Sequence, residues 1–312
     1  MSIVSVCITT YNRKDLLFKA VKSVCQQSYK NIEIIIVDDC SNDGTDVIVK
    51  DKLLELDHRI NYIRHKTNRG LASARNTALR NAKGKFYTFI DDDDEWNTHF
   101  IEEFIKTASQ YSSDWCFVCG YKYINNKGKV YDVIPHYEGK LKDIIYQGYS
   151  PPVASQFYYL DTVKSVGGFN ESVKSGIDHD LWIKLASRDV SVKTLPQALS
   201  IPNFNILMDR MTAKIEVREN FILDSLLIWK SQLVSTFGMK FYKHFCNEYK
   251  FYLIYNSIKY YAINSRYLHA FRVFNQSKYK KRIIFSIIER GIRKYSNNTV
   301  REVELQPIFK PF

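Results

Sequence analysis

The chain has 312 residues, of which 45% are apolar and 25% are charged, and these ordinary globular proportions exclude a disordered or fibrous chain. Its formal net charge is +12, and no run of about 18 apolar residues occurs, which argues against a helix that crosses a membrane. The 6 cysteines lie scattered, and the first residues lack the basic region of a signal peptide, so we expect a cytoplasmic protein with reduced thiols.

In chain order, the first elements alternate between strand and helix. Short apolar, β-branched runs predict strands that are buried on both faces of a parallel sheet, and apolar residues at spacings of three and four predict the helices between them. The predicted strands are 3–8, 32–37, 60–64 and 86–90, and the predicted helices are 14–27, 46–56 and 71–82. This alternation with short connections predicts right-handed βαβ units and an α/β fold.

Polar residues follow three of the predicted strands, where open α/β sheets bind their ligands. Thr9, Tyr11 and Arg13 lie at the end of the first strand, Asp38 and Asp39 follow the second, and four aspartates at 91–94 follow the fourth. The glycine patterns of dinucleotide-binding loops and of P-loops are both missing after the first strand. We therefore expect a ligand site without either phosphate-binding loop.

The acidic run at 91–94 is the most informative of these loops. Crowded carboxylates repel one another unless a cation lies among them, and hard oxygen ligands suit Mg²⁺ or Mn²⁺. The alternative is a solvated acidic turn that caps a helix starting near Thr98. The position of the run directly after a buried strand, level with Asp38 and Asp39, favours a metal–nucleotide site.

Several segments together carry a resemblance to a known family. They are 4–13, 37–45, 68–76, 89–96 and 167–182, in the same order and at similar spacing. These segments resemble the family 2 glycosyltransferases with the GT-A fold, the inverting transferases of bacterial surface-polysaccharide assembly. The resemblance covers residues 3–212. It implies a Rossmann-like nucleotide-sugar-binding domain over 1–212, followed by a helical C-terminal region over 213–312.

The resemblance also implies a donor site. The second aspartate of the Asp-Asp-x-Ser turn, here Asp39, would receive the uracil of a UDP-sugar by a charge-assisted hydrogen bond. Thr9 and Tyr11 would line the base pocket, Arg13 would bind the nucleotide, and Arg75 would lie beside the nucleobase and the acidic loop.

Within the acidic loop, the resemblance implies that Asp91 or Asp92 approaches the ribose and that Asp93 binds Mn²⁺ or Mg²⁺. Four consecutive aspartates leave this register open by one residue. The family's catalytic base maps to Asp178, where Ile177 replaces the common preceding Glu, and Asp180 is the alternative. Arg210 resembles the basic residue of a mobile loop that reaches the diphosphate.

The last third of the chain differs in composition. Residues 221–312 hold 16 Lys and Arg against 5 Asp and Glu, and 14 Phe and Tyr fall between residues 241 and 285. Apolar spacing predicts helices over 216–237, 240–264, 266–275 and 283–292. Basic faces interleaved with aromatic rings suit an anionic membrane surface, so we expect peripheral binding to the inner face of the cytoplasmic membrane. The alternative is a helical domain with a solvated charged face.

Together these features predict an inverting, metal-dependent glycosyltransferase. It would move a single hexose from a UDP-sugar to a saccharide acceptor on a lipid diphosphate, in O-antigen or capsule synthesis. The Gln-x-x-Arg-Trp motif of processive relatives is missing from the sequence, which favours one sugar per encounter. The alternative function is a non-catalytic binder of anionic lipid or nucleic acid; we expect no nucleic-acid partner, because no nucleic-acid module is recognisable.

Overall fold

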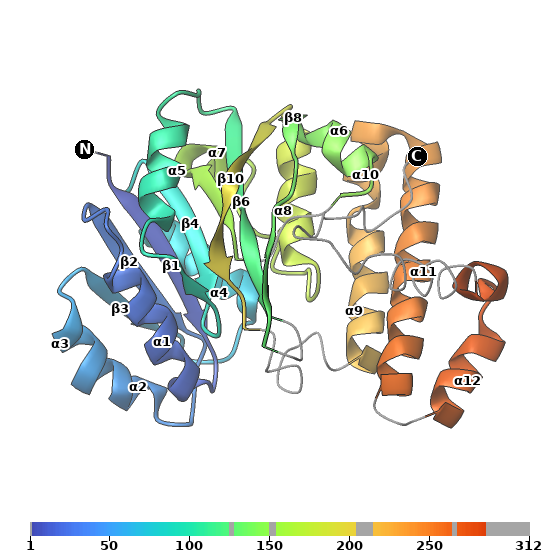
Figure 1. Cartoon of the computed structure of the whole chain (residues 1–312), viewed down its shortest axis with the longest axis horizontal. Coiled ribbons are helices and arrows are strands. Elements are labelled where there is room, and N and C mark those ends of the chain that lie inside the picture. The colour runs from blue at the N-terminus through green and yellow to red at the C-terminus, as the bar shows by residue number, and fades with distance from the viewer. Residues whose placement is uncertain (1, 125–127, 150–153, 204–214, 264–266, 285–312) are drawn as a thin grey trace.

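A computed structural model describes residues 2–124, 128–149, 154–203, 215–263 and 267–284 (Figure 1). Its centre is a ten-stranded mixed sheet whose main path runs in the order β3-β2-β1-β4-β9-β6-β10-β5, with β7 paired to β6 and β8 to β10. The strands are β1 (Val4–Thr10), β2 (Ile32–Asp38), β3 (Ile60–Arg64), β4 (Phe86–Asp91), β5 (Glu95–Trp96), β6 (Trp115–Ile124), β7 (Val130–Val133), β8 (Glu138–Lys140), β9 (Gln156–Tyr159) and β10 (Ser191–Ile201).

The first four strands form the predicted parallel half of the sheet. β1 lies between β2 and β4 and is parallel to both, and β3 extends the sheet beyond β2. Thr10 pairs with Asp38 and Thr9 pairs with Asp91, so β1, β2 and β4 end level with one another. The prediction that their polar loops meet at one edge is confirmed.

The other half of the sheet is mixed rather than parallel. β9 runs antiparallel between β4 and β6, and β6 is parallel to β10. The parallel part of the sheet therefore ends at β4. The next strand in the sheet is β9, which comes after β6 to β8 in the sequence and runs antiparallel to β4.

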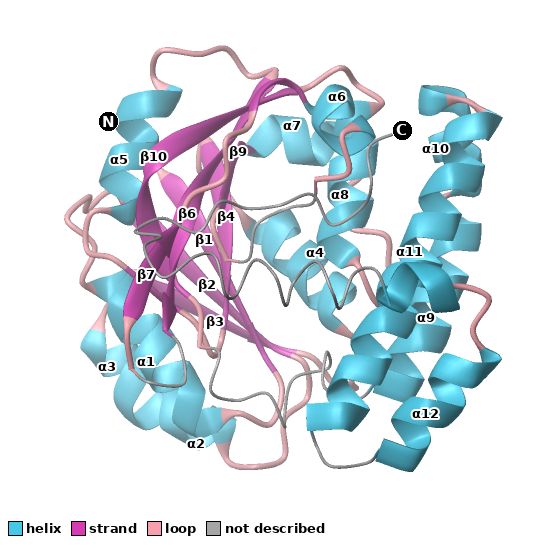
Figure 2. Ribbon diagram, turned by 45° about the vertical axis from the view of Figure 1, so that its right-hand side comes forward, coloured by secondary structure: helices cyan, strands magenta, loops and turns pink. Residues whose placement is uncertain are grey.

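Helices cover both faces of the sheet (Figure 2). One apolar cluster joins alternate residues of β1 and β2, such as Ile8 and Ile36, to Leu17 of α1 and Phe104 of α5. The opposite cluster joins Cys7 and Val37 to α4 and α8. The helices over the first 203 residues are α1 (Lys14–Cys25), α2 (Thr45–Ile48), a π-helix (Val49–Leu53), α3 (Leu54–Leu56), α4 (Leu71–Asn81), α5 (Phe100–Ala108), α6 (Leu141–Tyr146), α7 (Leu160–Ser165) and α8 (Ile177–Ala186).

The helix predicted over 46–56 is three short helical segments. α2 and α3 each span only a few residues, and between them Val49–Leu53 winds as a π-helix. Val49 and Leu53 are both buried and anchor this segment against the sheet. The apolar spacing therefore predicted that this segment is helical, but not that its middle part is a π-helix.

The C-terminal helices are α9 (Ile215–Ile228), α10 (Lys230–Phe237), α11 (Met239–Ile263) and α12 (Tyr267–Gln276), stacked beside α8 on one side of the sheet (Figures 1 and 2). The single helix predicted over 216–237 divides at Trp229, whose ψ of −8° departs from the helical value of about −42°. The helix predicted over 283–292 lies almost wholly outside the described residues.

These helices share an apolar cluster with the sheet domain. Leu226, Trp229 and Phe245 belong to the same buried cluster as Leu181 and Trp182 of α8. The composition change near residue 213 therefore marks a change in secondary structure without a break in the core. Of the helices within the described residues, none combines the length and apolar composition needed to cross a bilayer.

Candidate active site

The aspartates of the acidic loop after β4, residues 91–94, do not all face the same way. Asp92 turns inward and is buried, where its carboxylate accepts hydrogen bonds from Thr10 Oγ1 at 2.7 Å and from Arg13 Nη1 at 3.1 Å. Arg13 also pairs with Asp93 at 3.5 Å. Burial raises the pKa of Asp92 to about 6 even though the Arg13 guanidinium opposes that rise. Asp92 and Arg13 thus join the β1 loop to the acidic loop.

The other three aspartates form a candidate cation site. Asp91, Asp93 and Asp94 each offer a carboxylate oxygen, and these oxygens lie within 4.8 Å of one another. Asp94 is fixed from beyond the loop, since its Oδ1 accepts the backbone N–H of Asn203 at 2.9 Å. A set of hard carboxylate oxygens fits Mg²⁺ or Mn²⁺, so the donor chemistry agrees with the predicted group. The set includes Asp93, the predicted ligand, and leaves Asp92 out.

Arg75 connects this loop to α8. Its buried guanidinium donates from Nη2 to Asp91 Oδ1 at 3.0 Å and from Nη1 to Asp178 Oδ1 at 2.5 Å. The ring of Phe89 lies 4.1 Å and that of Phe169 5.5 Å from the guanidinium carbon. Burial alone would lower the pKa of Arg75, but the carboxylates of Asp178 and Asp91 outweigh it and raise that pKa overall. Arg75 is therefore a fixed cation between two partly exposed carboxylates.

Asp178 and Asp180 occupy the first turn of α8 but have different surroundings. Asp178 has a side chain that is 37% exposed, and Arg75 binds one of its oxygens. Asp180 is buried and accepts hydrogen bonds from Trp229 Nε1 at 3.0 Å and from the backbone N–H of Asn170 at 3.1 Å, and it pairs with Lys184 at 2.8 Å. Asp180 is 2% exposed whereas the Asp178 side chain is 37% exposed, which favours Asp178 as the group open to a substrate.

Asp39 lies at the end of β2, with its carboxylate turned toward the loop before α4. It accepts the backbone N–H groups of Arg69 at 2.9 Å and Gly70 at 2.7 Å. His65 Nδ1 lies 2.7 Å from the same carboxylate. A carboxylate has about four acceptor positions, so these three contacts orient Asp39 and leave it capacity for one further donor.

The β1 loop residues lie close to Asp39 along the backbone. The N–H of Asp39 donates to the carbonyl of Thr10 at 2.9 Å, next to Thr9, which is buried. Tyr11 follows at once and is 46% exposed. Arg210 lies outside the described residues. The structure thus groups Thr9, Tyr11 and Asp39 at one end of the strand edge, and groups Arg13 with the acidic loop.

His65 was missed by the sequence analysis. Its Nε2 lies 2.9 Å from Thr77 Oγ1, which also accepts a hydrogen bond from Arg80 Nη2 at 2.9 Å. In the neutral ring, the Thr77 hydroxyl proton is then directed to Nε2, and Nδ1–H is the donor to Asp39. The pairing of β2 with β3 explains why His65 lies beside Asp39. The two strands are parallel, and Asp38 is paired with Arg64, so the residues that follow them, Asp39 and His65, come together.

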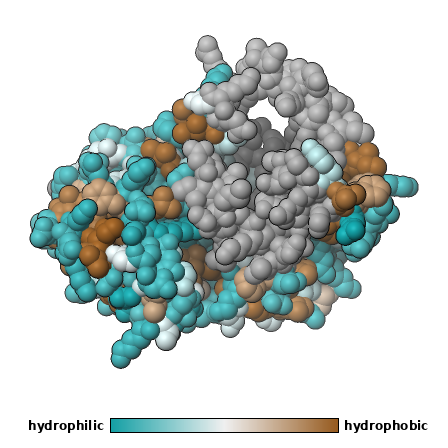
Figure 3. Space-filling view, turned by 90° about the horizontal axis from the view of Figure 1, so that it is seen from below, coloured by the Kyte–Doolittle hydropathy of each residue, from teal (hydrophilic) through white to brown (hydrophobic). Residues whose placement is uncertain are grey.

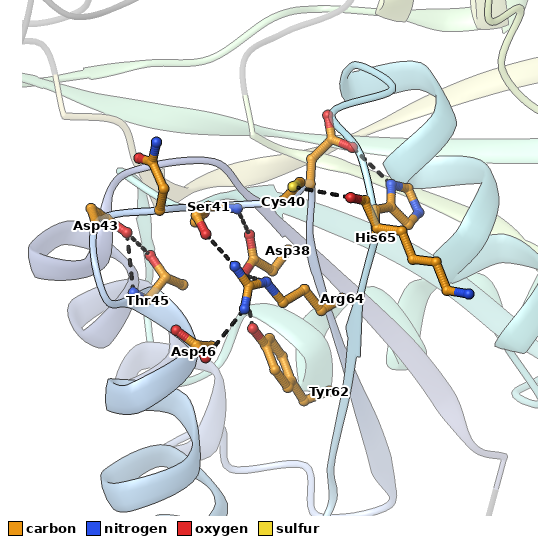
Figure 4. A network of polar contacts seen from close by, with 12 residues as sticks. Asp38, Cys40, Ser41, Asp43, Thr45, Asp46, Tyr62, Arg64 and His65 are labelled. Atoms are coloured by element: carbon orange, nitrogen blue, oxygen red, sulfur yellow. Dashed lines mark hydrogen bonds and ion pairs between the residues drawn. The ribbon is translucent and has the colours of Figure 1, made fainter.

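Asp38 belongs to a separate network that was also missed (Figure 4). Its buried carboxylate accepts the backbone N–H of Ser41 at 2.8 Å and the hydroxyl of Tyr62 at 2.8 Å, and it pairs with Arg64 Nε at 3.5 Å. Arg64 also reaches Asp46 at 3.2 Å. Asp38 therefore shapes the β2 loop, whereas Asp39 binds His65 and the loop before α4.

Comparisons with known proteins show which family and which fold this chain resembles. A model of glycosyl transferase family 2 matches residues 5–159. The chain is 46% identical over 110 residues to the UDP-Glc:alpha-D-GlcNAc-diphosphoundecaprenol beta-1,3-glucosyltransferase WfaP of Escherichia coli, an alignment that covers 33% of this chain and 42% of the relative. The chain spans less than two thirds of the length of the first curated relatives it matches, between 18% and 58%.

Solved structures share the fold. The S. aureus TarS 1–349 structure in complex with UDP-GlcNAc has a TM-score of 0.58 and 22% identity, over 75% of this chain and 67% of that chain. The mannosyltransferase PcManGT from Pyrobaculum calidifontis, in complex with GDP-Man and Mn²⁺, has a TM-score of 0.59 and 17% identity, over 96% and 88%. Residues 5–159 therefore form a glycosyltransferase family 2 domain, within a chain that has the GT-A fold.

Proposed function

We propose that this chain is a metal-dependent, inverting glycosyltransferase that moves one hexose from a UDP-sugar to a saccharide acceptor in bacterial surface-polysaccharide synthesis. One observation carries the proposal: Arg75 joins Asp91 of the acidic loop to Asp178 of α8 through one guanidinium. A group suited to the leaving diphosphate and a group suited to the acceptor hydroxyl are thereby held side by side. Transfer of a glycosyl group needs both.

On the donor side, Asp39 would accept the N3–H of uracil with its remaining acceptor position, while His65 and the Arg69 and Gly70 amides hold the carboxylate in place. Thr9 and Tyr11 would line the base pocket beside it. Support for a uracil nucleotide comes from the relatives: WfaP is named for UDP-Glc, and the TarS structure holds UDP-GlcNAc.

The acidic loop and Arg13 would hold the diphosphate end of the donor. Of Asp91 and Asp92, the partly exposed Asp91 would lie toward the ribose, and Asp93, with Asp91 and Asp94, would hold Mn²⁺ or Mg²⁺. When bound, the cation supplies positive charge that stabilises the leaving diphosphate. The PcManGT structure of the same fold contains Mn²⁺, which supports a divalent cation here.

On the acceptor side, Asp178 would act as general base. The acceptor hydroxyl oxygen attacks the anomeric carbon opposite the diphosphate, its proton passes to the Asp178 carboxylate, and the bond to the diphosphate breaks with its electron pair on UDP. This back-side displacement inverts the anomeric centre, so an α-linked donor gives a β-linked product. Arg75 binds one Asp178 oxygen and leaves the other for the acceptor.

The acceptor proposed is a saccharide on a polyprenyl diphosphate, as in the name of WfaP. Such an acceptor lies in a membrane, and we propose that α12 binds the inner face of the cytoplasmic membrane peripherally. Its Tyr267, Leu268 and Phe271 are more than 60% exposed, and the exposed bases Lys280 and Lys281 follow. Apolar side chains are visible on this helical half when the molecule is seen from below (Figure 3).

A screen of nucleotide sugars tests the proposal. The full chain is incubated with UDP-, GDP- and dTDP-hexoses, Mn²⁺ or Mg²⁺ and a polyprenyl-diphosphate-linked saccharide, and nucleotide release and product are measured. We expect UDP release and product only with metal, loss of both with EDTA, and their recovery on adding Mn²⁺. Turnover of a GDP-sugar alone would contradict the role of Asp39. Turnover of a dTDP-sugar alone would contradict the UDP donor and not Asp39, because thymine carries the same N3–H as uracil.

Substitution in the acidic loop separates catalysis from simple binding. Asp93→Asn is expected to lower transfer by at least about 10²-fold, because a charged ligand is lost where diphosphate charge develops. Asp51→Asn, an exposed aspartate on the π-helix, is the matched control and should transfer normally. If Asp93→Asn transferred as well as the wild type, the role of Asp93 would be contradicted; if the wild type showed no transfer and Asp93→Asn left nucleotide affinity unchanged, a non-catalytic binder of anionic lipid or nucleic acid would be the better explanation.

A further inference from the structure

The C-terminal helices hold both ends of the first turn of α8. Ahead of the turn, Ser225 Oγ of α9 lies 2.8 Å from the carbonyl of Ser175 and 2.8 Å from that of Phe221, and these two carbonyls share its one proton. Within the turn, Trp229 Nε1 donates to Asp180 Oδ1 at 3.0 Å. Asp178 lies between these two attachment points. The position of the proposed base is therefore fixed by contacts from a part of the chain more than 45 residues away.

Trp229 also fills the space over the start of α8. Gly176 precedes the helix with a φ of +78°, and a Cβ at this position would lie only 2.8 Å from Cη2 of the Trp229 indole. The ring of His179 lies 5.6 Å from that of Tyr249 and 6.3 Å from that of Trp229. The indole is 2% exposed. Packing and a hydrogen bond together thus prevent the helix start from shifting toward α9 and α10.

Asp180 passes this restraint to the other side of the site. Besides Trp229, it binds the backbone N–H of Asn170 and the ammonium of Lys184, and Lys184 donates to the carbonyl of Gly168 at 2.9 Å. These contacts fix the segment that contains Phe169, whose ring lies against the Arg75 guanidinium. Trp229 therefore restrains both Asp178 and the surroundings of its partner Arg75.

We propose that Trp229 is a positioning residue for glycosyl transfer: through Asp180 and Gly176 it sets the place of Asp178 relative to the acceptor hydroxyl. The proposal rests on the function proposed above. Trp229 contacts α8 directly and reaches Asp91 of the acidic loop only through α8 and Arg75, whereas the contacts that hold Asp39 come from the loop before α4 and from His65. Loss of the Trp229 contact should therefore slow the chemical step and leave donor binding intact.

Trp229→Phe tests this directly, because it keeps an aromatic ring and removes the N–H donor. Misplacement of a reacting group by about 1 Å can cost about 10²-fold in rate, so we expect kcat to fall by at least about 10-fold. The donor KM and the affinity for UDP with Mn²⁺ should change by less than about twofold, as for an interaction that acts only in the transition state. The control is Trp115→Phe, at the start of β6, where the ring packs on Tyr111 at 4.7 Å.

A milder pair of variants keeps the test decisive if Trp229→Phe is poorly folded. Ser225→Ala removes the second attachment and should lower kcat in the same way, whereas Ser235→Ala, which removes a hydrogen bond to the Gln232 carbonyl within α10, should not. Normal kcat in both Trp229→Phe and Ser225→Ala, with an active wild type, would overturn the positioning role alone. A parallel loss of kcat and donor affinity would also overturn it. A wild type that transfers no hexose would overturn the proposed function itself.

Discussion

At the residue scale, Arg75 is the side chain on which the candidate site converges. It is buried, it lies over Phe89, and it binds Asp91 and Asp178 with separate nitrogens. A planar guanidinium with several donors can hold two carboxylates in one fixed arrangement, which a lysine ammonium cannot reproduce. Because Arg75 leaves one oxygen of Asp178 for another partner, the same contact that fixes the carboxylate also keeps it available.

Asp178→Asn should abolish most of the transfer activity. The amide keeps the size of the side chain but cannot take up the proton of the acceptor hydroxyl. We therefore expect kcat to fall by about 10²–10⁴-fold, the usual contribution of a general base. UDP affinity measured by calorimetry with Mn²⁺ should stay close to that of the wild type. Asp189→Asn, an exposed carboxylate paired with Lys140 and Lys142, is the control and should keep full activity. Comparable activity in the two variants would contradict the assignment.

At the element scale, short polar clamps fix the connections between helices and strands. Asp57, after α3, accepts hydrogen bonds from Arg59 Nε at 2.9 Å and Nη2 at 2.5 Å. Arg59 Nη1 in turn donates to the carbonyl of Lys30 at 2.9 Å and Nη2 to that of Cys25 at 3.1 Å. The turn between α3 and β3 is thus tied to the end of α1, far from the candidate site.

This clamp predicts a pH-dependent contribution to stability. Hydrogen bonds from Arg59 lower the pKa of Asp57 from 3.8 to about 2. A folded-state pKa below the unfolded one gives stability that is present above pH 4 and is lost as the pH falls toward 2. Asp57→Asn should therefore lower the free energy of unfolding by about 1–2 kcal/mol at pH 7, and by less at pH 3. Urea denaturation at both pH values measures the difference, and an equal effect at the two would contradict it.

The exposed face of α12 carries the prediction for membrane binding. Leu268 is 76% exposed and Phe271 is 61% exposed. Burial of one such side chain in a bilayer is worth about 1.5–3 kcal/mol, so Phe271→Glu should weaken binding to phosphatidylserine vesicles by at least about 10-fold. Leu56→Glu, at an exposed leucine of α3, should bind normally in the same co-sedimentation assay. Equal binding by the two variants would show that α12 does not contact the bilayer.

At the scale of the whole molecule, the sheet and the C-terminal helices depend on one another. Trp229 and Phe245 lie in the same apolar cluster as Leu181 of α8. In addition, buried Asp180 receives one of its donors from Trp229. The predicted boundary near residue 213 therefore separates two regions of the sequence that pack together in the folded protein.

Removal of residues 213–312 should consequently destabilise the remaining chain. It would expose apolar side chains of α8 and leave a buried carboxylate short of a donor, each of which costs about 1–3 kcal/mol. We expect a melting temperature lower by at least about 10 °C, or aggregation, in thermal denaturation and size-exclusion chromatography. A monomer of 1–212 that melts like the full chain and binds UDP would establish two independent domains instead.

Local patterns were sufficient for the elements of the first ninety residues. Apolar runs and helical spacing determine β1 to β4 and the helices between them, since the central strands are covered on both faces and each helix buries one face against the sheet. The order of motifs along the chain also pointed to the family and to Asp39, Asp93 and Asp178. Contacts between distant segments were beyond such patterns, as the antiparallel insertion of β9 shows, and within the first ninety residues the change of helical pitch at Val49–Leu53 was also missed.

The sequence by itself determined the α/β class, the level strand ends and the family, because these follow from periodicity and from motifs within single segments. Only the tertiary structure decided which carboxylate faces which partner. Four consecutive aspartates look alike in sequence, but packing against Thr10 and Arg13 turns Asp92 inward and leaves Asp91, Asp93 and Asp94 together. The surroundings of Asp178 and Asp180 were likewise distinguished only by the fold, in which Trp229, between α9 and α10, donates to Asp180.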